Sequence, residues 1–265
     1  MSEETAPSGP CVERRDRDGV ATLTLNRERT LNVLSSAMVD ALQAELDRVA
    51  ADESVRVVVL GGAGRHFCAG HDLREMRAHR EEAWQKDLFA RCSRMMLSLT
   101  RLPQPVIARV QGAAVAAGCQ LVSMCDLAVA SDDARFALPG IKSGLFCTTP
   151  GVGASRNLSR KHVMELLLTG DPIDAHTAER WGLVNRAVPA RDLDDAVGTL
   201  ARTIAGHSRA VNALGKRLFY EQLERGLADA YDVAGDGMAC NMTFDDAAEG
   251  IDAFLGKRSP AWRGR

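Results

Sequence analysis

Two short segments of small residues in this chain could do chemistry through their backbone amides. "VRVVVLGG" leads through "AGRHF" to "CAGHDLREM", and "PVIARVQG" leads through "AAVAAG" to "CQLVSMCD". If each turn opens a helix, its first N–H groups are unpaired and lie at the positive end of the helix dipole. Two such turns can point donors at one spot, which is what an enolate or a tetrahedral oxyanion needs. The alternative is that the small residues only let helices pack closely.

Four side chains in or beyond these segments are candidates for chemistry, and each also has a purely structural interpretation. Gln120 is a polar residue in an apolar run; its amide cannot exchange a proton but can orient a carbonyl or carboxylate. The ring of His71 either contacts a substrate or is a spacer. Asp72 stands at a predicted helix start, where a cap is favoured over an acid. Cys147 in "LFCTTPG" is a nucleophile, a proton donor or a buried thiol, and the lack of an obvious basic partner favours the buried thiol.

The elements that must position these residues alternate between strand and helix over the first half of the chain. Ser35 or Ser36 can cap a helix over residues 37–52, and apolar side chains at helical spacing predict a second helix over residues 82–100. Short β-branched runs bounded by turn residues predict strands at residues 20–26, 55–62, 105–112 and 126–131. This alternation predicts an α/β fold with a largely parallel sheet.

After residue 160 the strand signal falls to one segment, residues 183–188, and helices dominate. They are predicted at residues 162–169, 175–180, 192–206, 209–224 and 228–242. We therefore divide the chain into a disordered tail at residues 1–10, a core at residues 11–200 and a C-terminal helical region at residues 201–265. We expect that region to pack against the core or against another subunit.

Composition excludes several classes of protein. The 265 residues are 46% hydrophobic and 26% charged with a net charge of −2, which is typical of one globular core and argues against nucleic-acid or membrane partners. The 7 cysteines lack CxxC or Cys/His spacing, so we expect no metal, a reducing compartment and a cytoplasmic location. The first ten residues lack the features of a signal peptide, and no apolar run is long enough to span a bilayer.

Seven segments carry a resemblance to a known family: "NRERTLNVL", "GRHFCAGHDLREM", "VQGAAVAAGCQLVSMCDLAVAS", "RFALPGIKSGLF", "TPGVGASRNLSR", "MELLLTGDPIDAHTAERWGLVNRAVP" and "GIDAFLGKRSPAW". In order and spacing they resemble the crotonase, or enoyl-CoA hydratase/isomerase, superfamily, from about Cys11 to Trp262. "AGHDL", "VAAGCQL" and "GLFCTTPGV" are near copies of the motifs of one subgroup. The resemblance implies a crotonase (ClpP-like) spiral of ββα repeats with a helical C-terminal trimerisation region, assembled as a homotrimer or a hexamer of paired trimers.

The resemblance also implies a ligand and site residues. The ligand is an acyl-CoA thioester of fatty acid metabolism, with no other cofactor. Its carbonyl oxygen would be held by the backbone N–H groups of His71 and Ala117, where Ala in place of the usual Gly is tolerable if its φ is negative. The coenzyme A contacts would come from Arg29, Thr30, Leu31, Ala69, Asp72, Leu73 and Lys257, the last of these often from another subunit.

The resemblance breaks at the two positions that matter for hydration. Hydratases of the family use two glutamates to activate water, and the matching residues here are Gln120 and Gly140. We therefore expect an acyl-CoA-binding protein that stabilises a thioester enolate, of the lyase type but without efficient hydration. One alternative is a decarboxylase, because methylmalonyl-CoA decarboxylase also has His at the position of His71, although its tyrosine aligns approximately with Cys147. The other alternative is a non-catalytic acyl-CoA-binding or regulatory homologue.

Overall fold

The computed structural model describes residues 9–265, so most of the predicted tail lies outside the described residues. Six strands form the main sheet in the order β1-β2-β3-β4-β6-β9, and all neighbours are parallel except the β1–β2 hairpin. A second sheet has the order β5-β7-β8. The strands are β1 (Val12–Arg17), β2 (Val20–Leu25), β3 (Val57–Gly62), β4 (Val106–Val110), β5 (Ala113–Val115), β6 (Leu127–Ser131), β7 (Arg135–Ala137), β8 (Ile173–Asp174) and β9 (Arg186–Val188). The predicted α/β class with a largely parallel sheet is confirmed.

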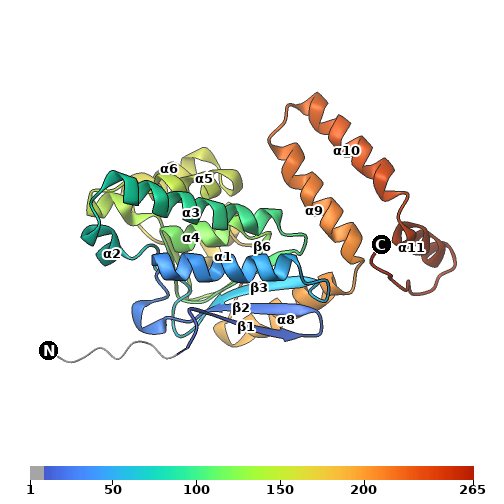
Figure 1. The fold of residues 1–265 in the computed structure, drawn as a ribbon, viewed down its shortest axis with the longest axis horizontal. Helices are drawn as coiled ribbons and strands as arrows, with labels where there is room; N and C mark the ends of the chain where they lie inside the picture. The colour runs from blue at the N-terminus through green and yellow to red at the C-terminus, as the bar shows by residue number, and fades with distance from the viewer. Residues whose placement is uncertain (1–8) are drawn as a thin grey trace.

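Alternating side chains bury both faces of the main sheet. On β3, Val58 and Leu60 join the larger core with α1 (Ser36–Ala50), α3 (Glu82–Arg101) and α4 (Ala117–Met124). Val57 and Val59 join a smaller core under α8 (Leu193–Ala205). Figure 1 shows α1, α3 and α4 on one side of the sheet and α8 on the other. The helix that carries Ala117 and Gln120, α4, therefore lies on the face of the sheet opposite α8.

Local signals explain where the helices begin and end. The Ser35 hydroxyl accepts a hydrogen bond from the Met38 N–H and caps α1. Ser35 is one of the two residues predicted as this cap. The remaining helices of the body are α2 (Leu73–Ala78), α5 (Thr148–Asn157), α6 (Arg160–Thr169) and α7 (Ala175–Trp181), with short 3-10 turns η1 (Glu28–Thr30), η2 (Pro139–Ser143) and η3 (Ala190–Asp192). Every predicted helix is present with its ends within about two residues.

The C-terminal helices form an arm that extends from the body (Figure 1). The arm consists of α9 (Arg209–Leu223), α10 (Leu227–Asn241) and α11 (Asp245–Leu255). It exposes many large apolar side chains: Phe219, Leu223, Leu227, Tyr231, Met238, Met242, Ile251, Phe254 and Leu255. The predicted division at residue 200 lies within α8, and the division into domains stays a prediction.

The strands that the sequence did not predict are short or polar, and α5 and α11 were not predicted either. β1 has the sequence "VERRDR", whose charged side chains suit an exposed sheet edge but hide the strand signal. β5, β7 and β8 have three residues or fewer. The strand predicted over residues 183–188 is reduced to its last three residues, because Leu183 and Val184 are buried in the turn that follows α7. In residues 9–265 no helix is long and apolar enough to cross a membrane.

Candidate active site

The two small-residue turns meet at the carboxyl end of the parallel strands. The Cys68 N–H donates to the Ala113 carbonyl at 3.0 Å, and the Val115 N–H donates to the Cys68 carbonyl at 2.9 Å. On the other side, the Leu34 N–H donates to the Gly70 carbonyl at 2.7 Å. The segment that contains His71 is thus held between the start of α1 and the segment that leads into α4.

Glycines allow this close approach. Gly70 has φ +93°, and a Cβ on it would lie 3.4 Å from the Ala117 amide nitrogen and 2.9 Å from the Ala116 Cβ. A Cβ on Gly118 would overlap the Cys68 carbonyl. The Gly70–His71 peptide therefore lies directly against the first turn of α4. Among the described residues, neither the His71 N–H nor the Ala117 N–H has a hydrogen-bond acceptor.

The backbone strain of the site falls on Ala116, which the sequence did not predict. Ala117 is the first residue of α4 and has a negative φ, so the condition set for Ala at that position is met. Ala116 instead adopts φ +50° and ψ −116°, a conformation that is costly for a residue with a Cβ. Its N–H donates to the Ala137 carbonyl at 2.9 Å. That bond and the contact with Gly70 hold the turn that aims the Ala117 N–H.

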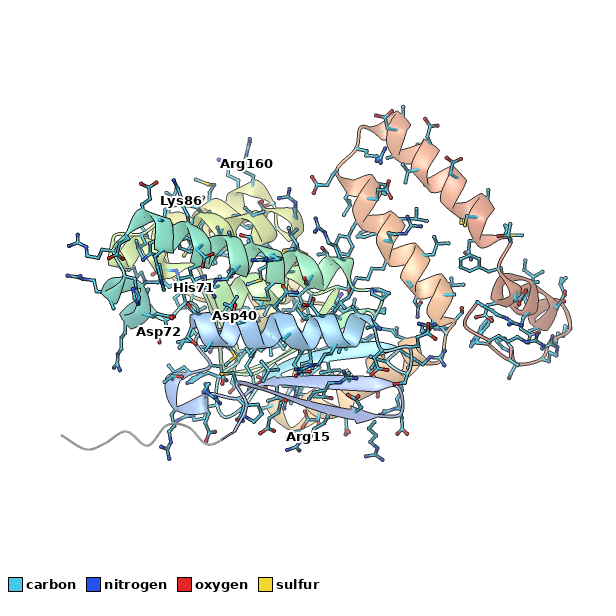
Figure 2. All side chains as sticks on the ribbon, viewed as in Figure 1. Arg15, Asp40, His71, Asp72, Lys86 and Arg160 are labelled. Carbon is cyan, nitrogen blue, oxygen red and sulfur yellow. The ribbon has the colours of Figure 1, made fainter. Side chains whose placement is uncertain are left out.

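His71 is held as a neutral ring. Its Nδ1 lies 3.1 Å from the Leu34 carbonyl, so Nδ1 carries the proton, and the ring meets Phe89 of α3 edge-on. Burial lowers the pKa of the imidazole, opposed by the Leu34 carbonyl and the Glu75 charge. The Nε2 atom is buried and has no partner within residues 9–265. Figure 2 shows His71 and Asp72 near α2, at the end of the body away from the arm.

Gln120 lies one turn into α4 and is 5% exposed. Its Oε1 atom is buried and accepts no hydrogen bond from any described residue. A buried polar atom without a partner is costly, so a ligand group or water that donates to it is expected. Gln120 and His71 are thus two neutral side chains with unused buried polar atoms, one beside each of the unpaired amides.

Asp72 is a helix cap, as predicted. Its Oδ1 accepts the N–H groups of Arg74 and Glu75 at 2.9 Å and 3.2 Å and so begins α2. Sequence reasoning overlooked Glu75, which stands four residues after His71 and whose charge acts on that ring. The Glu75 carboxylate accepts the Ser36 N–H at 2.9 Å. The signal that could have found it is the i, i+4 spacing across the start of α2.

Gly140 and Cys147 lie in contact in the segment between β7 and α5. The Gly140 N–H donates to the Cys147 Sγ at 3.3 Å. Cys147 is 8% exposed, and burial raises the pKa of its thiol, opposed by that N–H. Cys147 is therefore a buried neutral thiol at the N-cap of α5, the structural alternative favoured from the sequence.

The predicted coenzyme A contacts form one group with a single exception. Arg29 and Thr30 lie in η1, and the Ala69 N–H donates to the Leu31 carbonyl at 3.0 Å, which joins this turn to the segment of Asp72 and Leu73. The fully buried Asn32 fixes the junction, because its side chain accepts the Arg27 N–H and donates to the Ala63 and His66 carbonyls. Lys257 is the exception: it follows α11, which lies at the opposite end of the molecule from α2 (Figure 1).

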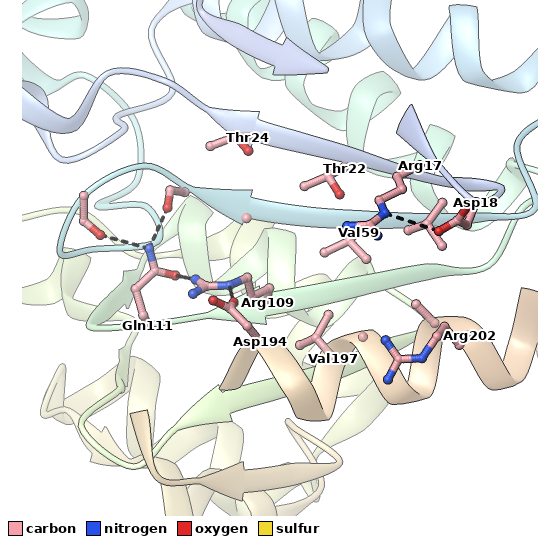
Figure 3. Close-up of a pocket in the computed structure, with 16 residues that line it drawn as sticks. Arg17, Asp18, Thr22, Thr24, Val59, Arg109, Gln111, Asp194, Val197 and Arg202 are labelled. Carbon is pink, nitrogen blue, oxygen red and sulfur yellow. Dashed lines mark hydrogen bonds and ion pairs between the residues drawn. The ribbon is translucent and has the colours of Figure 1, made fainter. Parts of the chain in front are cut away.

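A well-formed cavity lies elsewhere in the molecule. It has a volume of about 710 Å³ and lies on the other face of the sheet, between β2, β3, β4 and α8 (Figure 3). Its charged groups already have partners: Arg109 bonds to Asp194 at 2.5 Å and to Gln111 at 2.9 Å. None of the candidate residues lines it. Within residues 9–265 no group of three or more His, Cys, Asp or Glu side chains is arranged to hold a metal ion.

Known proteins are similar to this chain in sequence and in overall fold. The family described as enoyl-CoA hydratase/isomerase matches residues 15–265. A rat relative, "Enoyl-CoA hydratase domain-containing protein 3, mitochondrial", is 41% identical over 261 residues, which cover 97% of this chain and 87% of the relative. The crystal structure of the human enoyl-CoA hydratase domain-containing protein 3 has a TM-score of 0.93 at 41% identity, and covers 95% of this chain and 100% of that one. The structure of an enoyl-CoA hydratase of Mycobacterium smegmatis has a TM-score of 0.94 at 53% identity, and covers 96% and 99%.

These likenesses confirm the crotonase-type fold, and the subgroup whose motifs the sequence matches is enoyl-CoA hydratase domain-containing protein 3. The predicted cytoplasmic location is wrong by the same comparison, because the rat, frog, mouse and human relatives are all named mitochondrial. Free cysteines indicate a reducing environment but do not say which compartment supplies it. The free cysteines therefore could not distinguish a cytoplasmic from a mitochondrial location.

Proposed function

The chain belongs to the enoyl-CoA hydratase/isomerase family, and on that premise we propose that it binds a coenzyme A thioester and stabilises its enolate without the paired carboxylates of a hydratase. The thioester carbonyl oxygen accepts the backbone N–H groups of His71 and Ala117. The observation that carries the proposal is that these two amides are unpaired within residues 9–265 and lie on peptides in contact through Gly70.

The proposed oxyanion contacts follow from ordinary electrostatics. When an enolate forms, negative charge moves onto the thioester oxygen, and fixed N–H dipoles in a buried site stabilise that charge without having to reorganise. The Ala117 N–H also belongs to the first turn of α4, whose dipole adds to the same effect. The strained turn at Ala116 keeps this donor in place before the ligand arrives.

The side chains around the proposed oxyanion contacts favour chemistry without a protein base. Gln120 cannot lose a proton, and Gly140 has no side chain. Cys147 is a neutral thiol whose pKa is raised by burial. The ring of His71 has a lowered pKa and its protonated nitrogen bonded to the Leu34 carbonyl. A hydratase needs two groups that activate water, and these positions do not supply a carboxylate.

Decarboxylation of a 2-carboxyacyl thioester is the reaction that fits these groups. The bond between the α-carbon and the carboxylate breaks, its electron pair forms the enolate, and carbon dioxide leaves. The enolate then takes a proton from water at the α-carbon. The substrate supplies its own leaving group, so the site needs donors for the enolate oxygen and little water. The unpaired amides and buried neutral side chains support this over hydration.

We also propose that the protein works as a homotrimer or hexamer through the arm. The exposed apolar side chains of α9, α10 and α11 are numerous enough to need covering, which supports an interface there. In such an assembly Lys257 reaches the coenzyme A phosphates of another subunit, since it cannot reach the group around Leu31 in its own chain. Light scattering that finds only monomers at micromolar concentration would reject this assembly.

The experiment is incubation of the purified protein with crotonyl-, longer enoyl-, methylmalonyl- and ethylmalonyl-CoA, with products identified by mass spectrometry. Loss of carbon dioxide without gain of water is the expected result, and His71→Ala or Gln120→Ala should reduce it. His176→Ala is the matched control, because His176 is an exposed histidine on α7. Gain of water on an enoyl-CoA would overturn the proposal. Binding without any product would assign the chain to the non-catalytic alternative.

A further inference from the structure

The loop after β7 folds back so that its two ends touch. η2 is closed by Gly144, which has φ +72° and donates its N–H to the Ile141 carbonyl at 3.2 Å. The Leu145 N–H then donates to the Gly140 carbonyl at 2.9 Å. Two residues later the Cys147 Sγ accepts the Gly140 N–H at 3.3 Å. The chain between residues 140 and 147 is therefore a closed turn with the thiol against its first residue.

This turn leaves no room for a side chain at residue 140. A Cβ on Gly140 would lie 2.8 Å from the Cys147 Sγ, 3.0 Å from the Leu145 carbonyl oxygen and 3.3 Å from the Cys147 nitrogen. Gly140 does not have a positive φ, so the backbone conformation itself would accept any residue. Glycine is required here by space alone, and the largest single obstacle is the thiol.

The thiol also faces the helix that carries Gln120. Burial raises the pKa of the Cys119 thiol, with a smaller contribution from the Cys147 thiol, and Cys119 immediately precedes Gln120 in α4. Gln120 is 95% buried, since 5% is exposed, and its Oε1 has no partner among the described residues. The buried neutral thiol at the N-cap of α5 and the buried unpaired amide oxygen on α4 thus belong to two helices that pack against each other.

We propose that Cys147 occupies the volume of the missing side chain at residue 140 and forms a neutral wall that limits the size of the acyl group. This inference rests on the proposed function, because it assigns the wall to the acyl end of a coenzyme A thioester. The absence of a carboxylate at residue 140 then depends on the whole turn from Gly140 to Cys147 and not on residue 140 alone. A one-residue change at 140 cannot reverse it, because thiol and carboxylate compete for the same space.

The steric part is tested by thermal unfolding of Gly140→Ala, Cys147→Ala and the double variant. Gly140→Ala should lower Tm by several degrees in the parent and by clearly less in the Cys147→Ala background. Gly215→Ala is the control, because Gly215 lies in α9 with no atom near its added Cβ, and its effect on Tm should be the same in both backgrounds. Additive effects of Gly140→Ala and Cys147→Ala would overturn the inference.

The functional part is tested by calorimetric titration with saturated acetyl-, butyryl-, isobutyryl- and hexanoyl-CoA, which cannot be hydrated. Cys147→Ala should improve the affinity for the larger acyl groups severalfold relative to acetyl, and Cys147→Leu should reduce it. Cys125→Ala removes a buried thiol at the other end of α4 and should leave the ratios unchanged. If the parent binds and both Cys147 variants keep the same affinity ratios between larger acyl groups and acetyl, Cys147 does not limit the acyl group. The proposed function would not be affected by that result. A parent that binds no thioester would reject the proposed function and the wall together, while the Tm coupling would still decide the steric part.

Discussion

The α-carbon of Gly70 faces Ala116 so closely that an added Cβ would lie 2.9 Å from the Ala116 Cβ, at the turn that sets the Ala117 amide. The added methyl of Gly70→Ala would therefore disturb the turn that aims the Ala117 N–H, one of the two donors proposed to hold the thioester oxygen. We expect thioester affinity to fall at least about tenfold, equal to about 1.4 kcal/mol, as measured by calorimetric titration. Gly182→Ala is the control, because Gly182 has the same φ of +93° but its added Cβ comes no closer than 3.4 Å to the Asn157 carbonyl. Equal affinities for the two variants would contradict the placement of the donors.

The strained backbone at Ala116 predicts a stabilising substitution. A residue with a Cβ at φ +50° and ψ −116° costs about 1–3 kcal/mol, and glycine removes that cost while adding about 0.4–1 kcal/mol of unfolded-chain entropy. Ala116→Gly should therefore raise the free energy of unfolding in urea by about 1 kcal/mol. Ala117→Gly, one residue on and in helical conformation, should lower it. A loss of stability in Ala116→Gly would mean that the turn is not strained.

The lowered pKa of His71 predicts a loss of stability in mild acid. Burial keeps the ring neutral in the folded chain, whereas the unfolded chain takes up a proton near pH 6.5. The unfolded state therefore binds more protons, and this part of the stability is complete above about pH 6.5 and is lost as the pH falls through the folded-state pKa. The free energy of unfolding should fall more steeply between pH 7 and 5 in the parent than in His71→Gln. Parallel curves would show that the ring titrates alike in both states.

The arm is attached to the body by a buried ionic network around Lys216. Its Nζ pairs with Asp126 at 2.6 Å and donates to the Leu99 and Gln104 carbonyls at 2.8 Å and 2.9 Å, and the Tyr220 hydroxyl donates to Asp126 at 2.8 Å. Burial lowers the pKa of Lys216, opposed by Asp126. Removing one partner of a buried pair leaves a charge uncompensated, at a cost of about 3–5 kcal/mol.

Lys216→Met should therefore lower the free energy of unfolding by about that amount and loosen the arm, which hydrogen exchange of α9 would report. Lys86→Met is the control, because the Lys86–Glu82 pair on α3 is exposed on both sides and its loss should not be measurable. Equal stability of the two variants would show that the network does not hold the arm.

The sequence predicted those parts of the fold and site that depend only on residues close together in the chain. The segments "CAGHDL" and "VAAGCQL" each contain a turn and a helix start, so local rules were sufficient to predict the two turns, and the resemblance to the family assigned the donors within them to His71 and Ala117. The Asp72 cap followed from the same local chemistry.

Contacts between distant residues were not predictable in this way. Asp126 and Lys216 are 90 residues apart, and nothing in either segment marks them as partners. The thiol of Cys147 returns to Gly140 only because of the turn at Gly144, whose geometry a single sequence does not reveal. The strain on Ala116 arises from tertiary contacts with Gly70 and Ala137.

The contact between Gly140 and Cys147 changes how the lost hydratase chemistry can be restored. Gln120→Glu with Gly140→Glu supplies both acids. The Cβ of the side chain introduced at residue 140 would, however, clash with the Cys147 Sγ, so we expect little gain in crotonyl-CoA hydration and reduced stability. Adding Cys147→Gly removes the largest obstacle, and the triple variant should hydrate at least about 10²-fold faster than the parent, the lower range for general acid–base catalysis. Gln120→Glu alone is the control for a single acid. If the double variant already matches the triple, the thiol does not stand in the way. A parent that hydrates at typical enzyme rates would show that other groups replace the two glutamates.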